Sequence, residues 1–182
     1  MASGVSGSAG RATRSGLVTT NGLPPELDHP SDEAALYNPA FLALLLSAAA
    51  REYEDKSGEG MPWSIAFLVL PMTLPGTIRS TLPQRTNAYL SNWTRSSPLS
   101  RLEVAAQASA LAPFVREALR FGLRHRYFVL HGYRLSSAVG RARVDGAMGG
   151  EAITLVKASR LVGRWLSKTE PPQVFAQLGL RP

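Results

Sequence analysis

The side chains best suited to chemistry in this sequence are arginines and lysines that recur at helical spacing. Arg116, Arg120 and Arg124 follow one another every four residues, so a helix would place all three on one face. A second row advances by three, four and four residues through Lys157, Arg160, Arg164 and Lys168. Each row alone could also be an ordinary solvated helix face. Together they favour an anionic partner, because guanidinium groups donate paired hydrogen bonds to phosphates and carboxylates.

Four further arginines lie beside a segment with the pattern of a β-hairpin. Arg126 and Arg134 lie near its two ends, and Arg141 and Arg143 follow in the glycine-rich residues 138–150. These four and the two rows are the residues predicted to bind nucleic acid or an acidic protein surface. The charge distribution agrees: residues 1–99 carry 7 Lys/Arg and 8 Asp/Glu, whereas residues 100–182 carry 13 and 5. A basic half joined to a neutral half indicates a surface for an acidic partner, or else a generally arginine-rich surface.

Groups for catalysis or metal binding are sparse. There is no cysteine, and the three histidines, His29, His125 and His131, stand in no metal-binding spacing. The sequence has no phosphate-binding glycine loop and no nucleophile elbow. The acids from Glu52 to Glu59 are typical of an exposed helix end. We therefore predict no catalytic residue, no metal and no cofactor, and a protein that is not an enzyme.

The elements that position these residues are predicted to be mainly helices. Residues 1–30 are rich in Ser, Gly and Pro and are expected to form a disordered tail before a single helical domain, residues 31–182. A helix capped at Ser31 or Asp32 should run to Gly58, with a kink or restart at Pro39. Residues 63–72, opened by Pro62, favour a buried helix, with a buried strand as the alternative. Prolines should make the next stretch irregular, with one short helical turn.

The order of the following elements resembles a winged helix-turn-helix, over about residues 86–137. Thr86 or Asn87 should cap a first helix, which ends at residues 96–98. Residues 99–112 and 113–124 are expected to form two more helices, with Pro113 starting the last. A hairpin over 127–135, turning near Gly132, would be the wing, and the helix with Arg116 would be the one in a major groove. A mobile loop over 138–150, a helix over 151–168 and a last turn over 173–178 complete a helical bundle with one short β-hairpin.

Four short segments, taken in this order and spacing, resemble the middle component of three-component ABC systems. They are Glu33-Ala-Ala-Leu-Tyr-Asn-Pro-Ala-Phe-Leu42, Ala66-Phe-Leu-Val-Leu-Pro71, Val115-Arg-Glu-Ala-Leu119 and Val174-Phe-Ala-Gln-Leu-Gly-Leu-Arg-Pro182. The resemblance implies a bacterial protein encoded beside an SMC/Rad50-like ABC ATPase and an effector component, in a system that defends against phages. It implies no catalytic residues. By analogy with winged-helix subunits of SMC complexes, the role would be that of an adaptor between ATPase and effector.

Two functions therefore remain open from the sequence. The first is the adaptor subunit, with direct contact to DNA as an additional possibility. The second is a free-standing DNA-binding regulator of the winged-helix class. No signal peptide is recognisable, and the most apolar run, residues 65–70, is far shorter than the roughly 20 residues that span a membrane. We therefore expect a cytoplasmic protein with no membrane contact.

Overall fold

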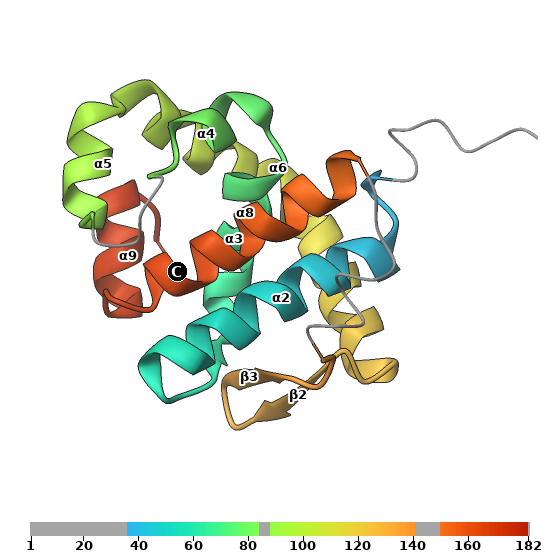
Figure 1. Cartoon of the computed structure of the whole chain (residues 1–182). Helices are drawn as coiled ribbons and strands as arrows, with labels where there is room; N and C mark the ends of the chain where they lie inside the picture. The colour runs from blue at the N-terminus through green and yellow to red at the C-terminus, as the bar shows by residue number, and fades with distance from the viewer. Residues whose placement is uncertain (1–35, 84–87, 141–149, 182) are drawn as a thin grey trace, which may run out of the picture. The chain divides into compact units, whose positions relative to one another are not determined.

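The computed structural model describes residues 36–83, 88–140 and 150–181, all within the unit Ser31–Pro182 (Figure 1). In chain order the elements are α2 (Pro39–Ser57), β1 (Met61–Pro62), η1 (Trp63–Ile65), α3 (Ala66–Thr73), α4 (Gly76–Thr81), α5 (Leu90–Ser96), α6 (Pro98–Arg124), β2 (Phe128–His131), β3 (Arg134–Ser137), α8 (Glu151–Leu166) and α9 (Pro171–Leu178). The prediction of a mainly helical protein with a hairpin is confirmed. The tail over residues 1–30 lies outside the described residues.

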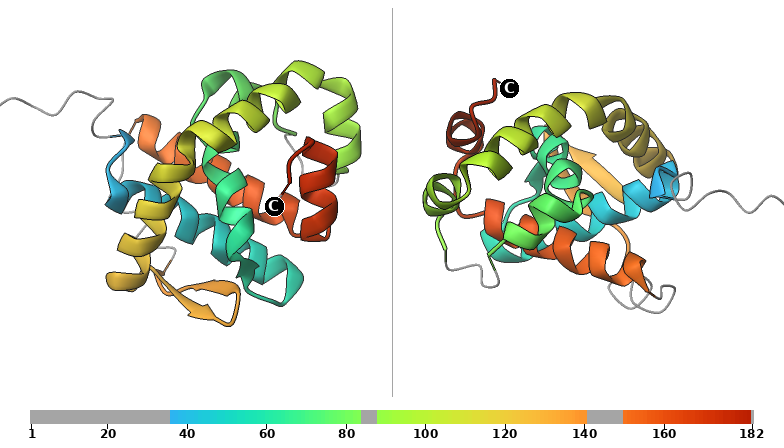
Figure 2. Two further views of the ribbon diagram at one scale, coloured as in Figure 1. Left: turned by 180° about the vertical axis from the view of Figure 1, so that it is seen from behind. Right: turned by 90° about the horizontal axis from the view of Figure 1, so that it is seen from above.

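Helices α2 and α8 lie side by side, and α3 packs between α8 and α6 (Figures 1 and 2). The closest point between α2 and α8 is at Gly163, where an added Cβ would overlap the Ala49 carbonyl and lie 2.9 Å from the Ala49 Cα. The two backbones therefore approach as closely as a glycine permits. This contact fixes the position at which one helix crosses the other.

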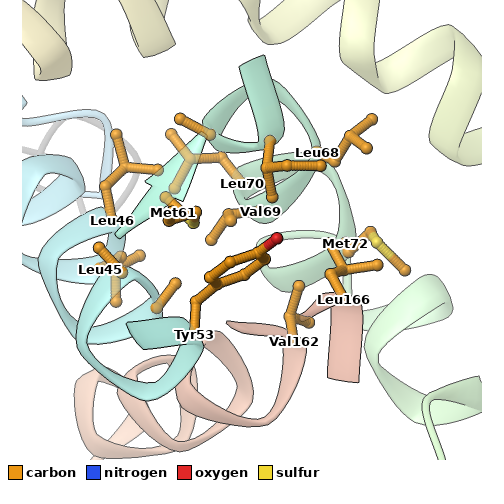
Figure 3. Packing of buried hydrophobic residues seen from close by; sticks show 14 of the residues in the cluster. Leu45, Leu46, Tyr53, Met61, Leu68, Val69, Leu70, Met72, Val162 and Leu166 are labelled. Atoms are coloured by element: carbon orange, nitrogen blue, oxygen red, sulfur yellow. The ribbon is translucent and has the colours of Figure 1, made fainter. Parts of the chain in front are cut away.

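The core fills the space enclosed by α2, α3 and α8 (Figure 3). Leu45 and Leu46 of α2 and Met61 of β1 are fully buried there, together with Val162 and Leu166 of α8. Helix α3 is buried on nearly every side, which explains why its sequence shows no polar face. The prediction of a helix over residues 63–72 is confirmed, and the strand alternative is wrong. Pro62 ends β1 and is also the N-cap of η1, so it directly precedes the helical segment as predicted.

Helix α6 is continuous from Pro98 to Arg124, so the predicted helix break at Pro113 is wrong. Val104, Leu111, Val115 and Ala118 form one buried stripe on both sides of that proline. Pro113 lies on the exposed face, where the unpaired carbonyl of the preceding turn can reach water. Burial of the stripe outweighs the single lost hydrogen bond. The turn that a helix-turn-helix requires at this position is therefore missing.

The β-strands form a three-stranded antiparallel sheet in the order β1-β3-β2. The predicted hairpin is confirmed: His131 pairs with Arg134, and Gly132 opens the two-residue turn with a φ of 61°. Strand β1 was not predicted, because two residues are too few to show an alternating pattern. Its Met61 pairs with Leu135, so the start of the α3 segment is tied to the hairpin.

A row of polar side chains on α2 holds this sheet in place. Ser47 donates to the Tyr127 carbonyl at 2.8 Å, and Arg51 donates to the Val139 carbonyl, also at 2.8 Å. Glu54 accepts a hydrogen bond from the Ser136 hydroxyl at 3.0 Å. Their spacing of four and three residues places them on one face of the helix. The hairpin is thus attached to α2 by hydrogen bonds rather than by apolar packing alone.

The ends of the helices agree with most of the predicted signals. Asn38 caps α2 by accepting from the Ala40 amide, Pro39 is its first residue, and Gly58 ends it with a φ of 78°. The start proposed at Ser31 or Asp32 lies outside the described residues. Tyr89, not Thr86 or Asn87, is the N-cap of α5, so that prediction is wrong. Helix α8 follows its predicted range closely, and the last turn is a helix that begins at Pro171.

Candidate functional site

The arginine row on α6 is exposed, as a binding face requires, but its members differ in their surroundings. Arg116 stacks over the Phe67 ring, with its guanidinium carbon 5.8 Å from the ring centroid. Arg120 forms an ion pair with Glu117 one turn earlier. Arg124 is exposed in the last turn. Only part of the predicted row is thus available for an anionic partner.

Arg126 occupies a position where glycine is normally preferred. Its φ is 57°, in the left-handed region, directly after the helix cap His125. The Tyr127 amide donates to the Gly122 carbonyl at 2.8 Å, which completes a Schellman motif at the end of α6. An arginine in this conformation is strained, and its side chain is exposed. Arg124, His125 and Arg126 together form an exposed helix end with two guanidinium groups, named here the α6 end cluster.

Arg134 lies in the predicted hairpin, as the first residue of β3, but its side chain makes contacts within the protein. It is half-buried, donates to the Gly60 carbonyl at 2.9 Å and forms an ion pair with Glu59. Its guanidinium also lies 5.1 Å from the centre of the Tyr133 ring. These contacts hold the turn before β1 against the hairpin, so its role is structural. Arg141 and Arg143 lie outside the described residues.

The basic row on α8 is only partly a free face. Arg164 forms an ion pair with Glu52 of α2, whose side chain is 8% exposed, at 3.4 Å. Arg160 is half-buried, whereas Lys157 and Lys168 are exposed. Because an unpaired carboxylate would be costly at such burial, Arg164 serves the contact between α2 and α8. The sequence could not distinguish this arginine from its exposed neighbours.

A groove that the sequence did not reveal is lined by residues of η1, α3 and α6 and by residues of α9 and the segment after it. It has a volume of about 370 Å³. Its lining residues are mostly apolar or small: Trp63, Ser64, Phe67, Leu68, Ala108, Ser109, Ala112, Phe175 and Leu180, with Arg116 and Arg181 as the charged members. Trp63 is 47% exposed, although the sequence placed it in the core.

The aromatic side of the groove is organised by its own contacts. Trp63 and Phe67 lie edge to face, with ring centroids 5.9 Å apart. On the opposite side, Gly179 ends α9 with a φ of 73°, and the Leu180 amide donates to the Phe175 carbonyl at 2.8 Å. This Schellman motif brings Leu180 beside Phe175. Four separate segments thus contribute fixed side chains to one surface.

The potential metal-binding side chains lie apart from one another in the part of the chain that the structure describes. Among residues 36–83, 88–140 and 150–181, no three His, Asp or Glu side chains lie in position to hold a metal ion. His125 stacks on Phe121 with ring centroids 4.2 Å apart, and His131 lies exposed on β2. His29 lies outside the described residues. Tyr53 is buried in the core, and its burial raises the pKa of its hydroxyl, against a smaller lowering by Arg134.

The sequence matches the family described as ABC-three component (ABC-3C) system Middle Component 3 over residues 28–182. The chain belongs to this family. The match covers every helix and strand described above. The resemblance found in the sequence is therefore confirmed, and this middle component is one part of a system with several components.

No curated protein and no solved structure matches this middle component significantly. Within the described residues, no helix is both long and apolar enough to cross a membrane. The family membership implies partner components.

Proposed function

We propose that this middle component is a non-catalytic adaptor subunit, which links an SMC/Rad50-like ABC ATPase to an effector component in a bacterial, cytoplasmic system that defends against phages. The observation that carries the proposal is the groove, an apolar surface rimmed by arginines on a member of a multi-component family. Exposed apolar surface of this kind is typical of a protein–protein contact.

The polar groups inside the protein also favour a binding role over a catalytic one. Glu52 pairs with Arg164, Ser47 pairs with the Tyr127 carbonyl, and Thr73 donates to the Val69 carbonyl at 2.6 Å. Each of these buried groups is thus occupied by a structural contact. A general acid or base would instead need access to a substrate.

Co-expression with the neighbouring gene products tests the proposal. The full chain, carrying an affinity tag, is expressed with the ATPase and effector encoded beside it and purified on the tag. We expect both products to co-purify and to elute together in size-exclusion chromatography. The ATPase of an unrelated system serves as the control. Clean separation of this chain from both neighbours would contradict the adaptor role.

Contact with DNA is a further part of the proposal, supported by the exposed α6 end cluster. A free-standing winged-helix regulator is less well supported, because α6 continues through Pro113 without a turn. A gel-shift titration at two salt concentrations tests the contact, since phosphate binding weakens steeply with salt. Replacing Arg124 and Arg126 with alanine should weaken binding, whereas Arg95→Ala on α5 should not. Absence of binding at low salt would remove DNA from the proposal.

A further inference from the structure

We infer that the groove between α3, α6 and α9 binds an acidic, amphipathic segment of a partner component. A large apolar side chain of that segment would enter the groove, and its carboxylates would lie beside Arg116 and Arg181. The inference rests on the proposed adaptor function and specifies the chemistry of the partner. It depends on three observations of the lining, which concern its apolar surface, its small residues and its charge.

The apolar part of the groove is incompletely covered in this chain. Trp63 is 47% exposed, although its neighbours in sequence, from Ile65 to Phe67, are buried or half-buried. Its ring is held edge to face by Phe67 and therefore cannot fold away from water without losing that contact. Half-exposed tryptophans set in a groove are typical anchors for protein partners, because they offer a large rigid apolar area. A partner's apolar side chain would complete this cluster.

The wall formed by α6 lacks the charges expected of an exposed helix face. No charged residue occurs between Glu103 and Arg116, although Ala106, Ser109, Ala110 and Pro113 are exposed. A solvated helix face normally carries charged or polar side chains. The small residues Ala108, Ser109 and Ala112 line the groove itself, so a partner's backbone could approach α6 closely. This wall is suited to contact with a polypeptide.

The charges around the groove all have one sign. Arg116 and Arg181 are the ionisable residues of its lining, and no carboxylate lines it in the described part of the chain. Arg116 differs from Arg120, which is neutralised by Glu117. Two guanidinium groups beside an apolar surface complement carboxylates that flank an apolar side chain. An acidic protein segment offers both an apolar side chain and carboxylates, so it fits this surface better than a nucleic acid duplex, which offers mainly phosphates.

Site-specific crosslinking identifies the occupant directly. A photoreactive p-benzoylphenylalanine replaces Ser109, an exposed residue of the lining, in the full chain co-expressed with the neighbouring ATPase and effector. Mass spectrometry of the irradiated complex should identify a peptide of one neighbour, with Asp or Glu flanking a large apolar residue. A crosslink to a basic peptide, to nucleic acid, to a second copy of this chain or to its own residues 1–35 would overturn the inference.

Paired substitutions test the shape and the charge of the groove. Ala112→Trp fills it, whereas Ala110→Trp adds the same side chain to an exposed position of α6 outside the lining. We expect the first change to lower the affinity for the neighbour at least about tenfold and the second to leave it unchanged. Arg116→Glu combined with Arg181→Glu should give a similar loss, and Arg95→Glu should give none. Circular dichroism and melting curves confirm that each variant is folded.

The outcomes separate this inference from the proposed function. If the wild-type chain binds neither neighbour, the adaptor function fails. If it binds, but Ala112→Trp and the charge-reversed variant bind as well as wild type, only the groove inference fails. A loss confined to these two variants, together with an acidic crosslinked peptide, would establish the groove as the binding site.

Discussion

At the scale of single residues, the strained backbone of Arg126 indicates a conflict between the stability of the fold and the binding of a partner. Its left-handed conformation at the end of α6 is one that glycine adopts without penalty, whereas an L-residue with a side chain is strained there by about 1 kcal/mol. The exposed arginine makes no buried contact that would offset this strain. Its presence is consistent with a role of the α6 end cluster in binding.

Replacing Arg126 with glycine should therefore stabilise the protein. We expect the free energy of unfolding to rise by about 0.5–1 kcal/mol, measured by urea denaturation. The control is Arg124→Gly, at the last residue of α6, which should lower stability by about 0.5 kcal/mol. If Arg126→Gly destabilises the protein instead, the arginine side chain contributes to the fold and is not kept for binding.

Tyr53 gives the protein a sensitivity to alkaline pH. Burial raises the pKa of its hydroxyl above the ordinary value of 10.0, so the folded protein keeps a proton that the unfolded chain loses. The stability contributed by the neutral hydroxyl is complete below pH 10 and is lost as the pH rises through the folded-state pKa. We expect wild type to lose more stability than Tyr53→Phe between about pH 9 and about pH 11.

Chemical denaturation at a series of pH values measures this difference. The control is Tyr89→Phe, because Tyr89 is exposed and is not one of the groups that shift the pKa of Tyr53; its pH dependence should follow that of wild type. Identical slopes for wild type and Tyr53→Phe would show that the hydroxyl is not protected from water in the folded state.

At the scale of elements, the accuracy with which the sequence predicts each helix depends on the spacing of the apolar residues in that helix. The sequence predicted α2 and α8 well, because each carries apolar residues at helical spacing over many residues. Each also has a clear start or end signal, such as Gly58. The predicted helix start at Pro113 was wrong. A proline begins a new helix only where the residues before and after it are not held in one helix by packing against the core. Here Val104, Leu111 and Val115 are buried on a single stripe across it.

Pro113 should lower the stability of the protein, and the fold should not require it. Pro113→Ala restores an amide that can donate to the preceding turn, and we expect a gain of about 1 kcal/mol in the free energy of unfolding. Ala110→Pro, also exposed on α6, provides the reverse change and should cost about 3 kcal/mol. Thermal denaturation of both variants measures these shifts. A loss of stability in Pro113→Ala would mean that the core requires a bend at this proline.

At the scale of the whole molecule, the crossing of α2 and α8 depends on a single glycine. A methyl group at Gly163 would overlap the Ala49 carbonyl, so the two helices would have to separate. We expect Gly163→Ala to destabilise the protein by about 2 kcal/mol or more, as overpacking of a core does. Gly76→Ala is the matched control, because its Cβ would meet only the Arg79 guanidinium, at 3.8 Å.

Urea denaturation of the two alanine variants distinguishes these cases. Gly76→Ala should leave the stability unchanged or slightly raised, since alanine restricts the unfolded chain. Equal stability of Gly163→Ala and wild type would show that α2 and α8 can move apart at little cost. Arg164 and Glu52 would then also have to tolerate a longer separation.

The groove could not have been predicted from the sequence, because the residues that line it are far apart in the chain. Periodicity identifies the buried side of one helix but not which helices leave a surface uncovered between them. Of the predicted binding residues, Arg116 was found at this groove, whereas Arg134 and Arg164 are used for structural ion pairs. Arginine spacing alone carries no information about the carboxylates that α2 and the turn before β1 supply.

The unbroken course of α6 sets a fixed distance between two possible contacts. Ala112 in the groove and Arg124 at the helix end are separated by about 18 Å along the axis, at a rise of 1.5 Å per residue. Both are carried by the same rigid rod, so ligands held at its middle and at its tip would keep a constant spacing and relative angle. An extra residue inserted between them would turn one attachment point by about 100° with respect to the other.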